Sequence, residues 1–141
     1  MSDDPYARDQ PIVWWLKHLD GLLTVSFERL LEAEGLGVAH WRALNAVAGG
    51  AGGTGEVEAA FSRLGVGDPA DAREAVSRLV TSGWLGADGG RLTLTPAGAE
   101  GRERLLRAQA GQHARLASGI APEDYRTTIA TLRRMARNLG Q

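Results

Sequence analysis

The side chains that most often carry metal or acid–base chemistry are sparse in this 141-residue sequence. Its three histidines, His18, His40 and His113, lie far apart, and it has no cysteine. It contains no His-x-x-His or His-Glu-x-x-His spacing, no Gly-x-Ser-x-Gly motif and no Gly-Lys-Ser/Thr phosphate loop. An enzyme would also need a paired acid and base, and none is evident. We therefore expect no catalytic residue, no metal site and no cofactor.

The composition is that of an ordinary globular domain. Apolar residues make up 43% and charged residues 23% of the chain, and its length fits a single domain over 1–141. No apolar run approaches the ~18 residues of a membrane span, and the acidic start of the chain is not followed by an apolar signal segment. With the absence of cysteine, these features predict a cytoplasmic protein without a membrane partner.

Charge is distributed unevenly although the net charge is only −1. Residues 1–37 carry 3 Lys/Arg against 7 Asp/Glu, residues 38–98 carry 5 against 6, and residues 99–141 carry 8 against 4. The C-terminal segment is therefore cationic, the N-terminal segment is acidic, and the middle of the chain is almost neutral.

Hydrophobic periodicity predicts six helices and one β-hairpin. The expected helices are 12–34, about 38–47, about 55–64, about 69–82, about 97–118, and a last one from 122. Thr54 has the chemistry of an N-cap, and Asp68-Pro69 is a strong helix start. The turn sequence Asp88-Gly89-Gly90 predicts a hairpin. This order predicts a mainly α fold with a small β-hairpin wing, namely a winged helix-turn-helix flanked by N- and C-terminal dimerisation helices.

The chain resembles the multiple antibiotic resistance regulator (MarR) family of bacterial transcription factors. The resemblance spans about 12–140 and is carried by four stretches and the terminal helix from Tyr125 to Leu139. The stretches are His40-Trp41-Arg42-Ala43-Leu44, Ala59-Ala60-Phe61-Ser62-Arg63-Leu64-Gly65-Val66, Val76-Ser77-Arg78-Leu79-Val80-Thr81-Ser82-Gly83-Trp84-Leu85 and Leu92-Thr93-Leu94-Thr95-Pro96-Ala97-Gly98. The family's members are homodimers that bind palindromic operators, and many release DNA when a small aromatic acid or a similar ligand binds.

The resemblance implies a lobe that binds double-stranded DNA over 38–96 and a helical dimerisation region over 12–37 and 97–141. Outward positions of the recognition helix, with Thr54 and the wing, are the expected DNA contacts: Thr54, Ala70, Asp71, Arg73, Glu74, Ser77, Arg78 and Arg91. Arg73 has the donors for a guanine edge, Ser77 suits a base or phosphate, and Thr54 suits a phosphate. The alternative is a merely solvated helix face.

Two departures from the family pattern weaken the expectation of DNA binding. The wing is cut down to Asp88-Gly89-Gly90-Arg91, which leaves only Arg91 for the minor groove. Asp68, Asp71 and Glu74 also put negative charge where phosphates would lie. A degenerate winged-helix module that binds a protein or a small molecule without DNA is therefore the rival hypothesis.

The resemblance also implies an effector pocket and a dimer interface. Trp15, His18, Leu22 and Trp41 are the expected lining of a pocket for a small aromatic or carboxylate effector, in which His18 could pair with a carboxylate. The alternative is that the tryptophans fill the core and the dimer seam. The expected dimer contacts are Ile12, Leu16, Leu116, Tyr125, Ile129, Leu132 and Leu139. The sequence thus predicts a homodimeric, ligand-responsive transcriptional regulator, more often a repressor than an activator.

Overall fold

A computed structural model describes residues 4, 6 and 8–140 of the chain. Within them the elements follow the predicted order of four helices, a hairpin and two helices. Their bounds are α1 Ile12–Glu32, α2 Val38–Ala48, α3 Thr54–Leu64, α4 Pro69–Thr81, β1 Leu85–Asp88, β2 Arg91–Leu94, α5 Pro96–Leu116 and α6 Pro122–Leu139. The prediction of a mainly α fold with a β-hairpin wing is confirmed.

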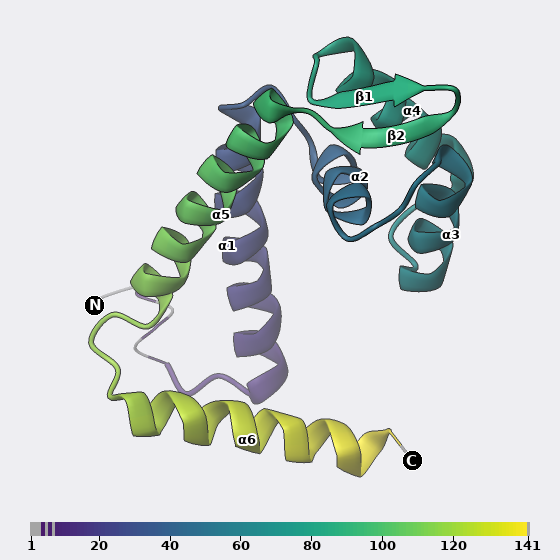
Figure 1. Ribbon diagram of the computed structural model, residues 1–141. Helices are drawn as coiled ribbons and strands as arrows, with labels where there is room; N and C mark the ends of the chain where they lie inside the picture. The colour runs from purple at the N-terminus through teal and green to yellow at the C-terminus, as the bar shows by residue number, and fades with distance from the viewer. Residues whose placement is uncertain (1–3, 5, 7, 141) are drawn as a thin grey trace.

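The elements form a lobe and a stalk (Figure 1). The lobe consists of α2, α3, α4 and the hairpin, and the stalk consists of α1 and α5, which run side by side away from it. Helix α6 turns away from the far end of α5 and lies across the open end of the stalk. Throughout the described part of the chain, we find no helix with both the length and the apolar content that a membrane crossing requires.

The hydrophobic core lies in the lobe, where the apolar faces of its three amphipathic helices meet the hairpin. Its largest fully buried side chains are Phe61, Leu31, Leu44, Leu79, Leu85, Leu105 and Val57. Leu31 comes from the last turn of α1 and Leu105 from α5, so one core includes both the lobe and the near end of the stalk. The orientation of the lobe on the stalk is therefore fixed by packing.

The two helix starts that the sequence marks behave differently. Asp68 caps α4 as predicted: its carboxylate accepts a hydrogen bond from the Asp71 N–H at 2.9 Å, and the Asp71 carboxylate accepts one from the Asp68 N–H at 3.1 Å. The predicted N-cap of α3 is wrong by one residue. Gly53 is the N-cap and Thr54 is already helical, because the extended backbone of Gly53 (φ −155°, ψ 167°) starts the helix one residue earlier, at a position that glycine tolerates. The Glu56 carboxylate accepts the N–H of Gly52, the residue before the cap, at 2.9 Å.

The wing is a minimal hairpin. Strands β1 and β2 have four residues each and pair antiparallel with Asp88 opposite Arg91. The two residues between them, Gly89 and Gly90, have φ of 58° and 81°, the left-handed conformation that a two-residue hairpin turn requires. The Leu92 N–H donates to the Gly52 carbonyl at 2.9 Å, which ties the wing to the glycine-rich loop before α3.

Polar side chains connect α5 to the neighbouring helices. Arg104 forms a bidentate ion pair with Glu34 at the end of α1, with nitrogen–oxygen distances of 2.9 and 3.0 Å. The hydrogen bond from Arg104 holds the pKa of Glu34 below its usual value. Closer to the start of α5, Arg102 donates to Asn45 of α2 at 2.9 Å. Gln112 donates to the Leu23 carbonyl of α1 at 3.0 Å. The bond of Arg102 fixes α5 against the lobe, and the bonds of Arg104 and Gln112 fix α5 against α1 and the turn that follows it.

The first turn of α2 depends on a neutral imidazole. The Gly37 N–H donates to Nδ1 of His40 at 2.8 Å, and this bond needs the unprotonated nitrogen. Burial of the ring lowers the pKa of His40, and the positive charge of Arg78 lowers it further, against an opposing effect of Glu74. The folded protein therefore disfavours the protonated ring.

Because the pKa of His40 is lowered on folding, we expect acid to reduce the free energy of unfolding. The unfolded chain binds this proton more readily, so the contribution is fully present above about pH 6.5 and is lost as pH falls through the lower folded value. In His40→Gln, melting temperature should depend less on pH between 7 and 5.5 than in the wild type. Equal slopes for the two proteins in thermal melts across this range would contradict the assignment.

Two glycines of α5 make a close contact between α5 and Trp84 possible. A Cβ at Gly98 would lie 2.9 Å from the Trp84 backbone carbon, and one at Gly101 would overlap the Trp84 ring. We expect Gly98→Ala to lower the free energy of unfolding by about 3 kcal/mol, because rigid backbone must move to accept the methyl group. Gly111→Ala is the matched control in the same helix: its Cβ meets nothing within 4 Å, so it should stabilise the fold by about 0.5–1 kcal/mol. Denaturant titration measures both, and a neutral Gly98→Ala would refute the contact.

Candidate nucleic-acid interface and effector pocket

The outward face of α4 carries most of the residues that the sequence predicts to contact DNA. Ala72, Ala75, Val76 and Leu79 are buried in the core, which turns the opposite side of the helix to solvent. All six predicted positions on α4 are exposed: Ala70, Asp71, Arg73, Glu74, Ser77 and Arg78. The helix therefore presents one continuous polar face, as a helix that enters a major groove must.

Both arginines of this face already have partners within the chain. Arg73 lies 3.3 Å from a carboxylate oxygen of Glu58 on α3, and its side chain is 58% exposed. Arg78 donates to the Gly35 carbonyl at 2.9 Å. Such exposed contacts contribute little to the free energy of folding, so the arginine side chains can exchange them for phosphate oxygens with little loss of stability. Asp71 is different, because its carboxylate is committed to the cap of α4.

Thr54 and Arg91 come from the two segments beside α4. The wing turn touches the loop before α3, since a Cβ at Gly53 would lie 3.6 Å from the Gly90 carbonyl oxygen. Thr54 begins α3 directly after this contact, and Arg91 begins β2 directly after the turn. The structure thus places both residues at the junction of the wing and α3. Arg91 is exposed, but the two-residue turn gives the wing a short reach.

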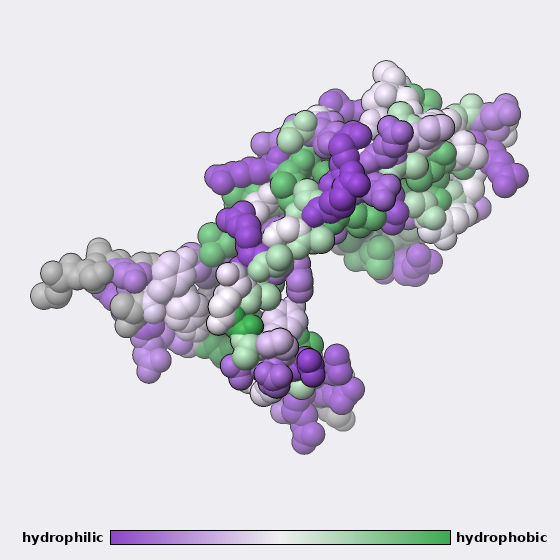
Figure 2. All heavy atoms as spheres, turned by 60° about the vertical axis from the view of Figure 1, so that its left-hand side comes forward, coloured by the Kyte–Doolittle hydropathy of each residue, from purple (hydrophilic) through white to green (hydrophobic). Residues whose placement is uncertain are grey.

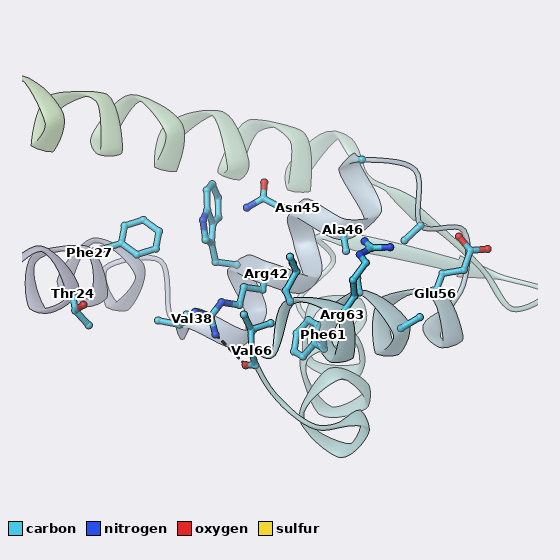
Figure 3. A pocket seen from close by; sticks show the side chains of 16 residues that line it. Thr24, Phe27, Val38, Arg42, Asn45, Ala46, Glu56, Phe61, Arg63 and Val66 are labelled. Carbon is cyan, nitrogen blue, oxygen red and sulfur yellow. Dashed lines mark hydrogen bonds between the residues drawn. The ribbon is translucent and has the colours of Figure 1, made fainter. Parts of the chain in front are cut away.

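A pocket of about 850 Å³ opens between α1, α2 and α3 (Figure 3). Its apolar walls include Phe27, Trp41 and Phe61, and the rings of Phe27 and Trp41 meet edge to face with centroids 5.8 Å apart. Arg42 and Arg63 supply positive charge to its lining. In Figure 3 these two side chains extend toward different ends of the pocket, Arg42 toward Val38 and Val66 and Arg63 toward Glu56.

The structure does not bring the four predicted effector residues together. Trp41 lines the pocket, whereas Trp15, His18 and Leu22 do not. Trp15 and His18 belong to an aromatic cluster at the start of α1, where the Tyr6 hydroxyl lies 2.9 Å from Nε2 of His18 and the His18 ring stacks on Trp14. Leu22 is 49% exposed on α1. In a single chain the pocket between α1, α2 and α3 and this aromatic cluster are separate features.

Sequence reasoning missed the polar lining of the pocket. Arg42 donates to the Val66 carbonyl at 3.0 Å across 24 residues of sequence, and Asn45 accepts from Arg102 across 57. Helical periodicity assigns a residue to a face of its own helix but not to a partner that distant. One feature of the sequence could have found them: Arg42 and Asn45 lie on α2 close to Trp41, which was predicted to line the pocket.

The predicted dimer contacts include strongly exposed apolar side chains. Ile12 and Leu16 on α1 are 46% and 45% exposed, and Ile129 and Leu139 on α6 are 39% and 90% exposed. Leu116, Tyr125 and Leu132 are half-buried. None of the residues of α6 is buried, although the helix has one apolar and one arginine-rich side. Hydrophobic surface is accordingly visible over the stalk as well as the lobe (Figure 2). Exposed apolar area of this extent is typical of an interaction surface.

Histidine, aspartate and glutamate side chains do not gather into a group of three or more that could hold a metal ion, as far as the described residues show.

Comparison with known proteins gives matches at the level of structure. No protein-family model matches the chain, and no curated protein matches it either. The chain is similar to a MarR-family transcriptional regulator from Silicibacter pomeroyi, with 25% identity, a TM-score of 0.63 and coverage of 91% of this chain and 89% of that one. It is also similar to a Mycobacterium tuberculosis MarR-family protein in complex with DNA (20% identity, TM-score 0.70, coverage 94% and 100%).

A further match is a Bordetella bronchiseptica protein whose DNA binding is regulated by 6-hydroxynicotinic acid (20% identity, TM-score 0.65, coverage 89% and 94%). The first two of these structures are named as MarR-family proteins, and the first of them as a transcriptional regulator. The chain therefore has the fold of the MarR-family transcriptional regulators, as its sequence motifs predict.

Proposed function

We propose that the chain is a DNA-binding transcriptional regulator that acts as a homodimer. The observation that carries the proposal is the exposed polar face of α4, held outward by the buried opposite side of the same helix. The solved DNA complex of a protein with this fold supports it. Arg73, Ser77 and Arg78 would contact bases and phosphates, Thr54 would bind a phosphate, and Arg91 would approach the minor groove.

The dimer would form through the far end of the stalk. Helix α6 has an apolar side without cover in a single chain, and α1 adds exposed Ile12 and Leu16. A two-fold axis there would carry two lobes to successive major grooves, which accounts for a palindromic operator. Blocking a promoter is the simplest consequence of such binding, so we propose a repressor.

A small aromatic or carboxylate molecule would control DNA binding. The regulated protein from Bordetella bronchiseptica supports this, because its effector is an aromatic acid. In this chain Trp41 is the predicted effector residue that lines the pocket between α1, α2 and α3, and Trp15, His18 and Leu22 would contribute only where a second copy brings them near it.

A winged-helix module that binds a protein or small molecule without DNA remains the second candidate. The charge of the proposed DNA-binding face favours this second candidate. Asp68, Asp71 and Glu74 repel phosphates, and both arginines of α4 already have partners within the chain. The two candidates differ in whether a duplex binds at low salt.

We expect the protein to bind duplex DNA with a slope of log affinity against log salt of about −5, since Arg73, Arg78 and Arg91 from two copies would contact roughly six phosphates. Glu74→Gln should raise affinity roughly three- to tenfold, because it removes a negative charge from the centre of the face without touching the cap. Fluorescence anisotropy between 25 and 200 mM salt measures both quantities.

Glu123→Gln on α6 is the control for this titration: it makes the same change in charge far from the lobe and should leave affinity unchanged. Absence of binding at 25 mM salt by both the wild type and Glu74→Gln would reject the regulator and favour the module without DNA.

We expect Ile129→Glu to dissociate the dimer, because it would bury a carboxylate in an apolar contact at a cost of about 3 kcal/mol or more. Thr127→Glu adds the same charge to the opposite side of α6 and should leave the dimer intact. Sedimentation at about 10 μM protein distinguishes the two species. A dimeric Ile129→Glu, or a monomeric wild type, would show that α6 is not the contact.

A further inference from the structure

The exposed face of α4 carries a carboxylate at its centre, a charge that is unfavourable for phosphates but suited to one base. We propose that Glu74 reads cytosine in the major groove by accepting a hydrogen bond from its N4 amino group, and so sets part of the sequence that the protein selects. This inference rests on the proposed function, because it requires that α4 enters a major groove. The position and the bonding of Glu74 within the chain carry it.

Helical periodicity divides the outward face of α4 into a central line and two flanks. At about 100° per residue, Glu74 projects directly away from the buried side of the helix, on one line with Ala70 and Ser77. Arg73 and Arg78 lie on opposite sides of this line. In a groove the central line comes nearest to the base edges, and the flanks face the two phosphate walls. Glu74 therefore has the position of a base-reading residue, and the two arginines have the positions of phosphate contacts.

The bonding of the acidic side chains on and near this face makes Glu74 the available acceptor. The Asp71 carboxylate is used in the cap of α4, and the Glu58 carboxylate lies 3.3 Å from Arg73. Among the residues that the structure describes, Glu74 forms no hydrogen bond and no ion pair. Together with Ser77 it lines a surface hollow of about 500 Å³. Its carboxylate can therefore accept from a ligand without breaking a bond inside the chain.

The pattern of donors and acceptors on the base edges selects cytosine. Guanine presents two acceptors in the major groove, N7 and O6, and thymine presents the O4 acceptor, so both repel a carboxylate. Adenine presents the N6 donor beside the N7 acceptor, so attraction and repulsion oppose each other. Cytosine presents the N4 donor without an acceptor of its own. The charge of Glu74 lowers affinity for every duplex through the phosphates, and cytosine is the base that best offsets this loss.

Ala70 extends the expected site by one position. It precedes Glu74 by one helical turn, and its methyl group suits the C5 methyl group of thymine. Residues four apart on a helix have Cβ atoms about 5–6 Å apart, whereas neighbouring base pairs are about 3.4 Å apart along the duplex. We therefore expect a thymine one or two base pairs from the cytosine. In a palindromic operator each half-site would carry both bases.

The base preference is tested by sequencing the duplexes that the protein selects from a random pool at 25 mM salt. The wild type should enrich a cytosine in each half-site. Glu74→Gln should enrich adenine at the same position, because a glutamine amide can donate to N7 and accept from N6. Glu123→Gln, which removes the same charge from α6, should select the wild-type site. A half-site without cytosine, or a cytosine that persists in Glu74→Gln, would overturn the proposal.

The N4 donor itself is tested with one modified base. N4-methylcytosine still pairs with guanine, but its methyl group replaces the N4 hydrogen that faces the major groove. Placed at the selected position, it should weaken wild-type binding about tenfold, the order expected for one lost specific contact, and should weaken Glu74→Ala less than twofold. Fluorescence anisotropy measures both affinities. An equal loss in the two proteins would assign the preference to another residue and overturn the role of Glu74.

Arg73→Ala tests the division between the central line and its flanks. If Arg73 contacts phosphate, its removal should weaken binding of duplexes with and without the cytosine by the same factor. Loss of the cytosine preference in Arg73→Ala would instead assign the reading to the guanine of the same pair, and would overturn the assignment to Glu74.

The outcomes separate this inference from the proposed function. Duplex binding without a cytosine preference would overturn the inference alone and leave the regulator in place. Absence of duplex binding at 25 mM salt by both the wild type and Glu74→Gln would reject the regulator, and the inference with it.

Discussion

The contact between α5 and Trp84 is the constraint on which the rest of the architecture depends. The backbone of α5 passes so close to Trp84 that Gly98 and Gly101 have no space for a Cβ. Thr95, the N-cap of α5, anchors the same point, since its hydroxyl lies 2.6 Å from the Gly83 carbonyl oxygen and accepts the Gly98 N–H at 3.0 Å. The stalk and lobe are joined here without a flexible linker, so a change in one is transmitted to the other.

Polar contacts between α5 and its neighbours lie close to this rigid junction. The bonds of Arg104 to Glu34 and of Arg102 to Asn45 lie on the part of α5 that is near the lobe. Asn45 also lines the pocket, so a bound molecule would touch α2 directly and α5 through a single hydrogen bond. The pocket thus lies among the contacts that orient the lobe on the stalk.

The sequence predicted the elements and their faces because local signals determine both. The Asp68-Pro69 start, the Asp88-Gly89-Gly90 turn and the buried side of α4 each depend on residues within one or two turns. The α3 cap was misplaced by one residue because Gly53, which has no side chain that could signal a cap, takes that position ahead of Thr54. The lining of the pocket was only partly predicted. The family resemblance predicted Trp41, but Arg42 lines the pocket beside Val66, and hydrophobic periodicity does not encode that contact.

The length of the stalk connects these local contacts to the spacing of two lobes. Helices α1 and α5 have 21 residues each, which corresponds to about 30 Å of helix. If two copies join at the far ends of their stalks, a tilt of each stalk by about 5° about that far end moves each lobe by roughly 2–3 Å. Half-sites one helical turn apart, about 34 Å, accept only a narrow range of separations. In the proposed dimer, a ligand that tilts the stalks would therefore act on DNA affinity without contacting DNA.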